Sequence, residues 1–472
     1  MADLPNIIWI MADDMGYGDV GAYNPASRIP TPNMDRLAAE GMRFTDAHSS
    51  SSVCTPSRYS VLTGRYCWRT RLKNGVNGGF SLPLIDPARP TVASVLRERG
   101  YTTAAVGKWH VGLEWQTATG DDFDREDWQD TGAVDYTKPI IGGPLAVGFD
   151  YFFGIAGSLD MPPYCFVEND RTVGIPSAEK SSYNPQQRKG LMTPGWQDEA
   201  CDPTFAAKAV GFIEAAKEED PDRPFFLYMT PAAPHRPCVP PTFAEGKSQA
   251  GPRGDGVWLV DWMVGQVLGA LDRLGCTEET LIFITSDNGA RPCDVDGIMH
   301  DHKSCGDLRG YKGDIWDGGH REPLIVRWPG VIAPDSACDE PVCLGDLMAT
   351  VCEIIARPIS GSVAEDSFSL LPLLKQDDEA YERAPVVHHS LSGMFSVRSG
   401  KWKMVLGLGS GGFSDPRRGY SVMPGAPEGQ LYDMLADWRE QHDVWNEHPE
   451  VVARLSAVLT STQESGRSVP RP

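Results

Sequence analysis

Four short apolar runs lie along the first 300 residues of the chain, and each stops abruptly at polar residues. They cover residues 6–11, 102–106, 224–229 and 281–285. Continuous apolar runs of this length are typical of strands that are buried on both faces of a sheet. The pattern therefore predicts four buried strands, each followed by a polar segment.

Longer stretches with helical spacing lie between these runs. The first has helix signals at both ends, with Thr31 as the N-cap, Pro32 in the first turn and Gly41 as the stop. Strands separated by helices favour a largely parallel sheet with helices on both faces, in which ligands bind at the carboxyl ends of the strands. The predicted helices cover residues 31–40, 91–99, 202–217 and 257–274.

The sequence changes in character near residue 376. Residues 395–406 alternate between apolar and polar positions like antiparallel strands, and residues 447–459 have helical spacing. We therefore predict two domains. Residues 1–375 would form a large α/β domain, and residues 376–472 a smaller α+β domain that contains an antiparallel sheet.

Acidic residues outnumber basic ones. The 472 residues include 64 acidic and 43 basic side chains, and the formal net charge is -21. This surplus argues against nucleic acid or anionic membranes as partners. An anionic substrate would need a local group of cations, or a bound metal ion that reverses the sign of the field in one pocket.

No apolar run approaches the roughly 20 residues that are needed to cross a bilayer. The first residues also lack a basic segment followed by an apolar one. We therefore expect a soluble protein without membrane insertion. It would be periplasmic or secreted if a signal peptide was removed, and cytoplasmic otherwise.

The eleven cysteines are an odd number, so at least one thiol has no disulfide partner within the chain. No two have C-x-x-C spacing, and neither a zinc ribbon nor a thioredoxin-type site is indicated. We expect most of them to be isolated buried thiols. Cys338 and Cys343 are the candidate disulfide pair if the compartment is oxidising.

All four predicted strands are followed by residues that can bind ions or transfer protons. Carboxylate and amide oxygens are the ligands that hard cations prefer, although single Asp and Asn residues also cap helices and form turns. Because the carboxyl ends of parallel strands meet at one edge of a sheet, we predict that these side chains form one site. In chain order they are Asp13, Asp14, Lys108, His110, His235, Asp287 and Asn288.

A longer motif begins at Cys54. Residues 54–58 read Cys-Thr-Pro-Ser-Arg, and residues 62–65 read Leu-Thr-Gly-Arg. This segment resembles the type I sulfatases, whose signature C-x-P-S-R-x-x-x-L-T-G-R is matched at every defined position. Asp317 and His320 depart from the Glu and the apolar residue that the family usually has there. Further segments similar to the family, in the family's order, are 13–19, 107–112, 234–235, 286–289, 310–313 and 431–433.

The resemblance implies an alkaline-phosphatase-like fold and a nucleophile that is made after translation. A separate maturation enzyme would oxidise Cys54 to formylglycine, and the hydrated aldehyde would carry two hydroxyl groups. One would attack sulfur, and deprotonation of the other would let sulfate depart as the aldehyde forms again. An ordinary Ser or Cys lacks that second hydroxyl.

The resemblance also assigns roles to individual residues. Arg58 and Lys108 would hold the diol and the sulfate oxygens, and Lys312 would bind sulfate. His235 would protonate the leaving alcohol, and His110 would assist sulfate release. Both histidines keep an alternative interpretation as core residues with structural hydrogen bonds.

The implied metal is Ca²⁺, with Mg²⁺ as the alternative. Three carboxylates, an amide oxygen and the diol can supply six or more oxygens, which suits the larger ion. The metal lowers the pKa of the attacking hydroxyl. The implied ligands are Asp13, Asp14, Cys54, Asp287 and Asn288.

The expected substrate is a sulfate ester of a small molecule or an oligosaccharide, with a carbohydrate sulfate favoured. Ser158 is a candidate sulfate contact, although its spacing fits the family loosely. Trp115, Trp128 and Trp316 either stack on a sugar or belong to the core. Two other functions stay open: a phosphonate monoester or phosphodiester hydrolase with the same nucleophile, and a binder of sulfated glycans without activity.

Overall fold

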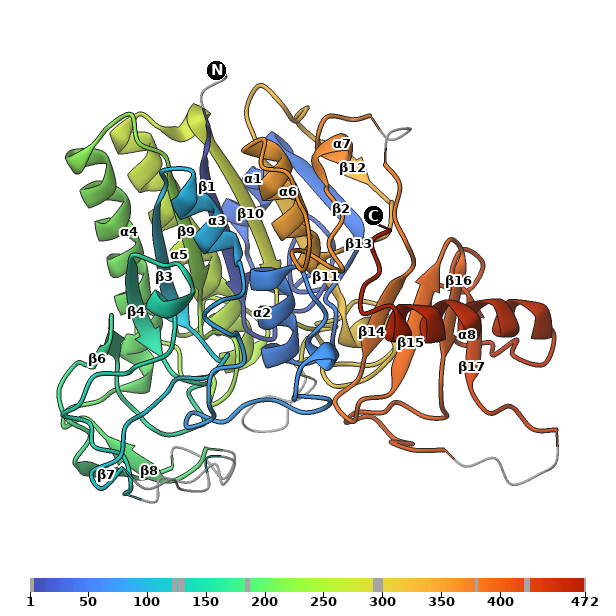
Figure 1. The fold of residues 1–472 in the computed structure, drawn as a ribbon, viewed down its shortest axis with the longest axis horizontal. Coiled ribbons are helices and arrows are strands. Elements are labelled where there is room, and N and C mark those ends of the chain that lie inside the picture. Colours follow the sequence, from blue (N-terminus) through green and yellow to red (C-terminus); the bar gives the residue numbers. More distant parts are fainter. Residues whose placement is uncertain are drawn as a thin grey trace.

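The computed structural model describes residues 4–120, 125, 132–182, 187–291, 300–377, 381–419 and 425–470. Its largest element is an 11-stranded sheet (Figure 1). β13 (Val342–Cys343) pairs with β2 at one end of this sheet. The other strands, in spatial order, are β12 (Ser336–Cys338), β2 (Met42–His48), β11 (Arg321–Arg327), β10 (Thr280–Ser286), β1 (Asn6–Ala12), β9 (Phe225–Thr230), β3 (Thr102–Lys108), β4 (Tyr151–Ile155), β5 (Val167–Glu168) and β6 (Arg171–Thr172).

The five central strands of this sheet, from β10 to β4, are parallel to one another. Antiparallel pairs occur only toward the two ends among the described strands, where β11 joins β10 to β2 and where β5 follows β4. The prediction of a large, mostly parallel sheet is confirmed. Parallel pairing places the carboxyl ends of all five central strands at the same edge.

Helices cover both faces of the large sheet because its strands are apolar on both sides. In β1, Ile7, Trp9 and Met11 pack into one core, whereas Ile8 and Ile10 pack into the other, and all five side chains are buried. Each such side chain contributes about 1.5–3 kcal/mol when it is fully buried. The first core contains residues of α2 (Cys54–Thr63), α3 (Val92–Glu98), α6 (Leu347–Ile354) and α7 (Leu371–Leu374), and the second those of α1 (Pro32–Glu40), α4 (Cys201–Glu219) and α5 (Gly251–Leu274).

A separate antiparallel sheet lies beside the large one, toward the C-terminus of the chain (Figure 1). Its apolar face packs on one side of the last helix, α8 (Pro449–Glu464), through Val451, Leu455 and Leu459. This confirms the predicted antiparallel sheet and C-terminal helix, while the boundary at residues 375/376 stays a prediction. The strands are β14 (Val386–His389), β15 (Phe395–Ser399), β16 (Trp402–Val405) and β17 (Gln430–Asp433), and a small hairpin elsewhere joins β7 (Ala178–Lys180) to β8 (Gly190–Met192).

The predicted start and stop of α1 are confirmed, with Thr31 at the N-cap position and Gly41 at the C-cap; the Thr31 hydroxyl bonds to Asp35 and to the Gly21 amide instead of capping a helix amide. No disulfide joins Cys338 to Cys343; each is the last residue of a different short strand that pairs with β2. Every described cysteine is buried and lies outside any disulfide.

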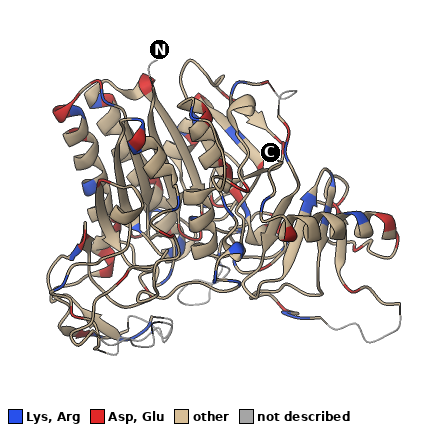
Figure 2. Cartoon of the chain, viewed as in Figure 1, with Lys and Arg blue, Asp and Glu red and all other residues tan. Residues whose placement is uncertain are grey.

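None of the helices in the described ranges is long and apolar enough to span a membrane. Figure 2 shows acidic and basic residues spread over the helices and loops of both parts of the fold, with few on the central strands. In this view the acidic residues are not confined to one element of the fold.

Candidate active site

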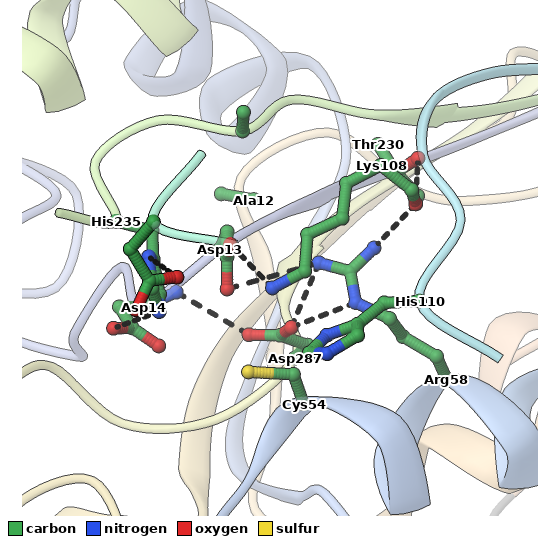
Figure 3. A network of polar contacts seen from close by, with 12 residues as sticks. Ala12, Asp13, Asp14, Cys54, Arg58, Lys108, His110, Thr230, His235 and Asp287 are labelled. Carbon is green, nitrogen blue, oxygen red and sulfur yellow. Dashed lines mark hydrogen bonds and ion pairs between the residues drawn. The ribbon is translucent and has the colours of Figure 1, made fainter. Parts of the chain in front are cut away.

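The polar residues at the ends of the central strands come together at one edge of the large sheet (Figure 3). Asp13 follows β1, and its carboxylate accepts a hydrogen bond of 2.6 Å from Nζ of Lys108, the last residue of β3. Asp287 follows β10 and accepts one of 3.3 Å from the Asp14 amide. The adjacency of β10, β1, β9 and β3 is the reason for this convergence.

Cys54 is the first residue of α2, and its buried Sγ lies 3.4 Å from Nζ of Lys312. Arg58 is four residues further along the helix, so both side chains lie on the same face. Ser57 fixes the start of the helix by donating to the carbonyls of Ser51 and Val53. The helix N-terminus carries a partial positive charge, which favours an anion at this position.

The end of the motif is explained by the end of α2. Gly64 has a φ of +63° and caps the helix in the left-handed conformation. A Cβ atom at Gly64 would lie 2.8 Å from Cβ of Met348 and 2.9 Å from Cα of Ala364. The glycine of Leu-Thr-Gly-Arg therefore permits both the turn and the close packing of α6.

Three buried cations face three buried carboxylates in this site. Arg58 donates to Asp287 from Nε at 2.9 Å and forms an ion pair with it from Nη2 at 2.7 Å, and Lys312 lies 2.5 Å from Asp14. Together with the pair between Lys108 and Asp13, the fixed charges balance. A bound divalent cation would make the site net positive, which an anionic substrate requires despite the acidic chain.

Several oxygens in the site accept no hydrogen bond from the described residues. They are Oδ1 of Asp13, Oδ2 of Asp14 and Oδ1 of Asn288, and all are buried. Buried acceptors without a donor are rare because each costs desolvation free energy. Two carboxylate oxygens and one amide oxygen fit a hard divalent cation. Asp13, Asp14, Cys54 and His235 also form a group whose ligand atoms lie within 4.8 Å of one another.

Burial and neighbouring charges shift the pKa values of the ionisable groups in the site in different directions. Burial raises the pKa of Asp13 to about 7, although Lys108 opposes this. Burial acts in the same direction on Asp287, but Arg58 and the two lysines outweigh it and lower the pKa of that carboxyl. Burial raises the pKa of the Cys54 thiol to about 12, so the unmodified side chain is neutral at pH 7.

His110 is arranged as a neutral base. Its Nε2 lies 2.8 Å from the carbonyl oxygen of Asn77 and must carry the proton, so Nδ1 has a free lone pair. Nδ1 has no hydrogen-bond partner among the described residues. Burial lowers the pKa of His110 well below 6.5, and Lys108 and Arg58 lower it further.

His235 has the opposite ring nitrogen anchored. Nδ1 lies 2.9 Å from the carbonyl oxygen of Arg236 and donates to it, and Nε2 lies 3.7 Å from Oδ2 of Asp14. Nε2 is therefore the nitrogen that faces the site. Burial lowers the pKa of His235, and Lys312 and Lys108 act in the same direction.

Ser158 lies beyond the end of β4, at the same sheet edge, and its buried hydroxyl has no hydrogen-bond partner in the described part of the chain. Sequence analysis did not identify Asp160, which lies nearby and pairs with Arg236 and Arg188 at 3.0 and 2.8 Å. Its Oδ1 lies 3.9 Å from Nδ1 of His235. Only the polar end of β4 could have pointed to this neighbourhood.

The tryptophans proposed for sugar stacking do not line an exposed surface where the structure describes them. Trp115 and Trp316 are both 3% exposed. Trp115 donates to the carbonyl of Gly79, and Trp316 to the amide oxygen of Gln430. Both belong to the core, whereas Trp128 lies outside the described residues.

A second buried ion pair supports the loop that carries Asp14. Arg253 binds both carboxylate oxygens of Asp19 at 2.7 and 3.0 Å and donates to the Asp14 carbonyl at 2.7 Å. Burial opposes ionisation of Asp19, but Arg253 and His302 outweigh it and lower its pKa to about 2. The loop position therefore depends on this pair.

We expect Asp19→Asn to lower the free energy of unfolding at pH 7 by about 3–5 kcal/mol, because it leaves the Arg253 charge buried without a counter-ion. The pKa of Asp19 is depressed in the fold, so its stabilisation is present above pH 3.8 and is lost as the pH falls toward 2. The pH-dependent part is about 2 kcal/mol. Urea unfolding of wild type and variant from pH 7 to pH 2 measures both. The exposed Asp222→Asn is the control, and a wild-type unfolding curve for Asp19→Asn would contradict the expectation.

The fold and this site define a hydrolase of esters of tetrahedral oxyanions. The sulfatase family model matches residues 5–355, and the chain belongs to the sulfatase family. It is 34% identical to an N-acetylgalactosamine-6-O-sulfatase of Bacteroides thetaiotaomicron over 97% of this chain and 93% of the relative. It is 35% identical to human arylsulfatase A over 84% and 74%. The protein is accordingly a sulfuric ester hydrolase.

A solved structure agrees with this assignment. It comes from work on the metabolism of multiple glycosaminoglycans by Bacteroides thetaiotaomicron and superposes with a TM-score of 0.83. It is 31% identical in sequence and covers 98% of this chain and all of its own. A second structure, of a protein in complex with its substrate D-glucosamine-2-N,6-O-disulfate, has a TM-score of 0.65 at 19% identity and supports the fold alone.

Proposed function

We propose that this protein removes sulfate from a sulfated carbohydrate with a formylglycine made from Cys54 and one hard divalent cation. The supporting observation is the convergence of Cys54, Lys312 and the acceptor oxygens without donors on one buried point. Ca²⁺ is the proposed ion, with Mg²⁺ as the alternative, because the donors are oxygens. When bound, the ion lowers the pKa of the attacking hydroxyl and draws the anionic ester into the site.

The side chains of this chain would divide the remaining work. Lys108 and Lys312 bind the sulfate oxygens, and Arg58 holds Asp287 in place while its helix presents residue 54. The Asn77 carbonyl holds the Nε2 proton of His110, so Nδ1 is unprotonated. Nδ1 takes up a proton and so assists sulfate release. Ser158 is a candidate contact to the sulfate because its buried hydroxyl lacks a partner within the described residues.

His235 is the proposed acid for the leaving alcohol. The Arg236 carbonyl holds Nδ1–H, so the proton that is donated comes from Nε2. The free imidazole is neutral, and the bound sulfate ester supplies the negative charge that favours its protonated form. Lys312, whose pKa is raised mainly by Asp14 against the effect of burial, is the second candidate.

We expect His235→Ala to slow sugar sulfates more than aryl sulfates. A phenolate departs with little protonation, whereas a sugar alkoxide needs a proton, and general acid catalysis contributes about 10²–10⁴-fold. The measurement is kcat/KM for a series of sulfate esters that differ in leaving-group pKa. A steeper dependence in the variant supports the role. An equal loss across the series would transfer the acid role to Lys312.

The first substrate to test is 6-O-sulfated N-acetylgalactosamine. The relative from Bacteroides thetaiotaomicron, which aligns with this chain over 93% of its length, is named an N-acetylgalactosamine-6-O-sulfatase. A panel of sulfated mono- and oligosaccharides, with the product position determined by NMR, extends the test. Turnover of one sugar sulfate well above aryl sulfate supports a carbohydrate substrate. Comparable rates for all sugars at or below the aryl sulfate rate would contradict it.

The phosphodiester alternative is decided in the same assay. A sulfate monoester carries one negative charge, and a phosphodiester also carries one, so charge alone does not separate them. Parallel kcat/KM values for an aryl sulfate and an aryl phosphodiester are therefore required. A preference for the phosphodiester by orders of magnitude would overturn the proposal of a sulfated substrate. Glycan binding without turnover in fully modified protein would favour the alternative of a sulfated-glycan binder without activity.

A further inference from the structure

Three histidines meet in the core between the large sheet and the C-terminal sheet. His48 is the last residue of β2, His320 precedes β11, and His388 lies in β14. Ring centroids of His320 and His388 are 4.1 Å apart, and those of His48 and His388 are 4.9 Å apart. All three side chains are fully buried. None of them belongs to the candidate active site.

Each histidine has one ring nitrogen anchored by a neighbour. Nε2 of His48 lies 2.8 Å from Oδ1 of Asp46, and Nε2 of His320 lies 3.0 Å from the carbonyl oxygen of Ile315. Nδ1 of His388 lies 3.1 Å from Oγ of Ser396. An anchor of this kind on one ring nitrogen is what fixes the orientation of a metal-binding histidine and leaves its other nitrogen as the ligand.

The second nitrogens of the three rings are close together. Nδ1 of His48 lies 3.1 Å from Nδ1 of His320. Two nitrogens that are each about 2.0 Å from a tetrahedral Zn²⁺ are separated by roughly 3.3 Å. One nitrogen from each of the three rings lies within 4.8 Å of the others, and the His388 ring, which is stacked on that of His320, must rotate for its nitrogen to share an ion with the other two.

A hydrogen-bond chain without metal accounts for only part of this arrangement. Lys403 lies 3.2 Å from Nε2 of His320 and could donate to it, after which Nδ1–H of His320 would donate to His48. That tautomer removes the donor from the Ile315 carbonyl. It also leaves Nε2 of His388 with no hydrogen-bond partner in the described structure, although the residue is fully buried. A metal ion would use all three lone pairs and would leave the anchors of His48 and His320 in place.

The surrounding charges permit a divalent ion. Lys403 is held between Asp317 and Glu440 at 2.7 Å from each, so it has partners other than His320. Arg398 pairs with Asp46 at 3.0 Å. With Arg321, which pairs with Asp317, three cations balance three carboxylates around the imidazoles.

We propose that His48, His320 and His388 bind one transition-metal ion of the zinc class and so fasten the C-terminal sheet to the large sheet. Three imidazoles suit Zn²⁺, Ni²⁺ or Cu²⁺, whereas the oxygen-rich active site suits Ca²⁺ or Mg²⁺. The two sites therefore differ in the metal that they select. The ion is a structural one, because all three ligands are fully buried in the core.

The test is a titration of chelator-treated, folded wild-type protein with Co²⁺ in the presence of saturating Ca²⁺, followed by absorption spectroscopy. The site should bind one equivalent with the visible bands of tetrahedral or five-coordinate Co²⁺, and Zn²⁺ should displace it. Binding to the native state alone should raise the Tm. Ca²⁺ keeps the active site from contributing to the signal.

Two variants separate this site from other binding. Ser396→Ala removes only the anchor of His388 and should weaken Co²⁺ affinity about 10- to 100-fold while the fold is kept. His388→Gln should abolish the bands, and His389→Gln, which changes the adjacent buried histidine, should retain them. The absence of a one-equivalent Co²⁺ signal in folded wild type, or equal binding by wild type, Ser396→Ala and His388→Gln, would overturn the proposal.

Discussion

Cys54→Ser is expected to abolish multiple turnover, with a loss of at least about 10³-fold in kcat, while the protein remains folded. A serine that stays unmodified has only one hydroxyl, so its sulfated form would have no second hydroxyl through which to release sulfate. A thiol left unmodified is no substitute, because burial raises the pKa of Cys54 to about 12 and the nucleophilic thiolate is scarce at pH 7.

The wild type gives a second measure of the same step. Activity should rise in proportion to the fraction of chains in which Cys54 is formylglycine, as determined by peptide mass spectrometry in preparations with and without a co-expressed maturation enzyme. Cys67→Ser is the matched control, since Cys67 is another free, fully buried thiol near the end of the same motif. Full steady-state turnover by wholly unmodified Cys54 would contradict the proposed nucleophile.

The sequence predicted the sheet well because its central strands are apolar on both faces. Residues such as Ile7 and Ile8 of β1 point to opposite cores, and only a parallel sheet with two helical layers buries both. The polar residues after those strands were placed at one edge by the same argument. The strand bounds differ from the predictions by only one or two residues at most ends, because polar residues such as Lys108 and Ser286 continue the backbone pairing.

What the sequence did not reveal depends on contacts between distant segments. Asp160 and Arg236 meet beside His235 although they lie in unrelated loops, and no local pattern marks either residue. The histidine cluster likewise joins β2, β14 and the segment before β11. In the sequence His320 differs from the family pattern but has no visible partner. In the fold it contacts His48 and His388, which lie far from it along the chain.

Asp287→Ala is expected to remove activity and to weaken retention of the active-site metal. Asp287 is buried between the Asp14 amide and the Arg58 guanidinium, and its lowered pKa keeps it ionised. The substitution removes a carboxylate beside the free oxygens of Asp13 and Asn288 and leaves Arg58 with its nearest counter-ion missing. Loss of even an outer-shell partner costs about 10- to 100-fold in metal affinity, so we expect a loss of more than about 100-fold here.

The measurement combines metal content after dialysis, by mass spectrometry of the elements, with kcat at increasing Ca²⁺. If Asp287 holds the ion, high Ca²⁺ restores part of the occupancy but little of the turnover, because Arg58 also loses its orientation. Asp261→Asn is the control, since Asp261 is buried in α5 and accepts hydrogen bonds from the start of α1, far along the chain from the metal donors. It should alter stability and leave the metal content unchanged. Full metal occupancy with wild-type turnover in Asp287→Ala would exclude Asp287 as a ligand, and zinc in place of Ca²⁺ or Mg²⁺ at this site would refute the oxygen-based assignment of the ion.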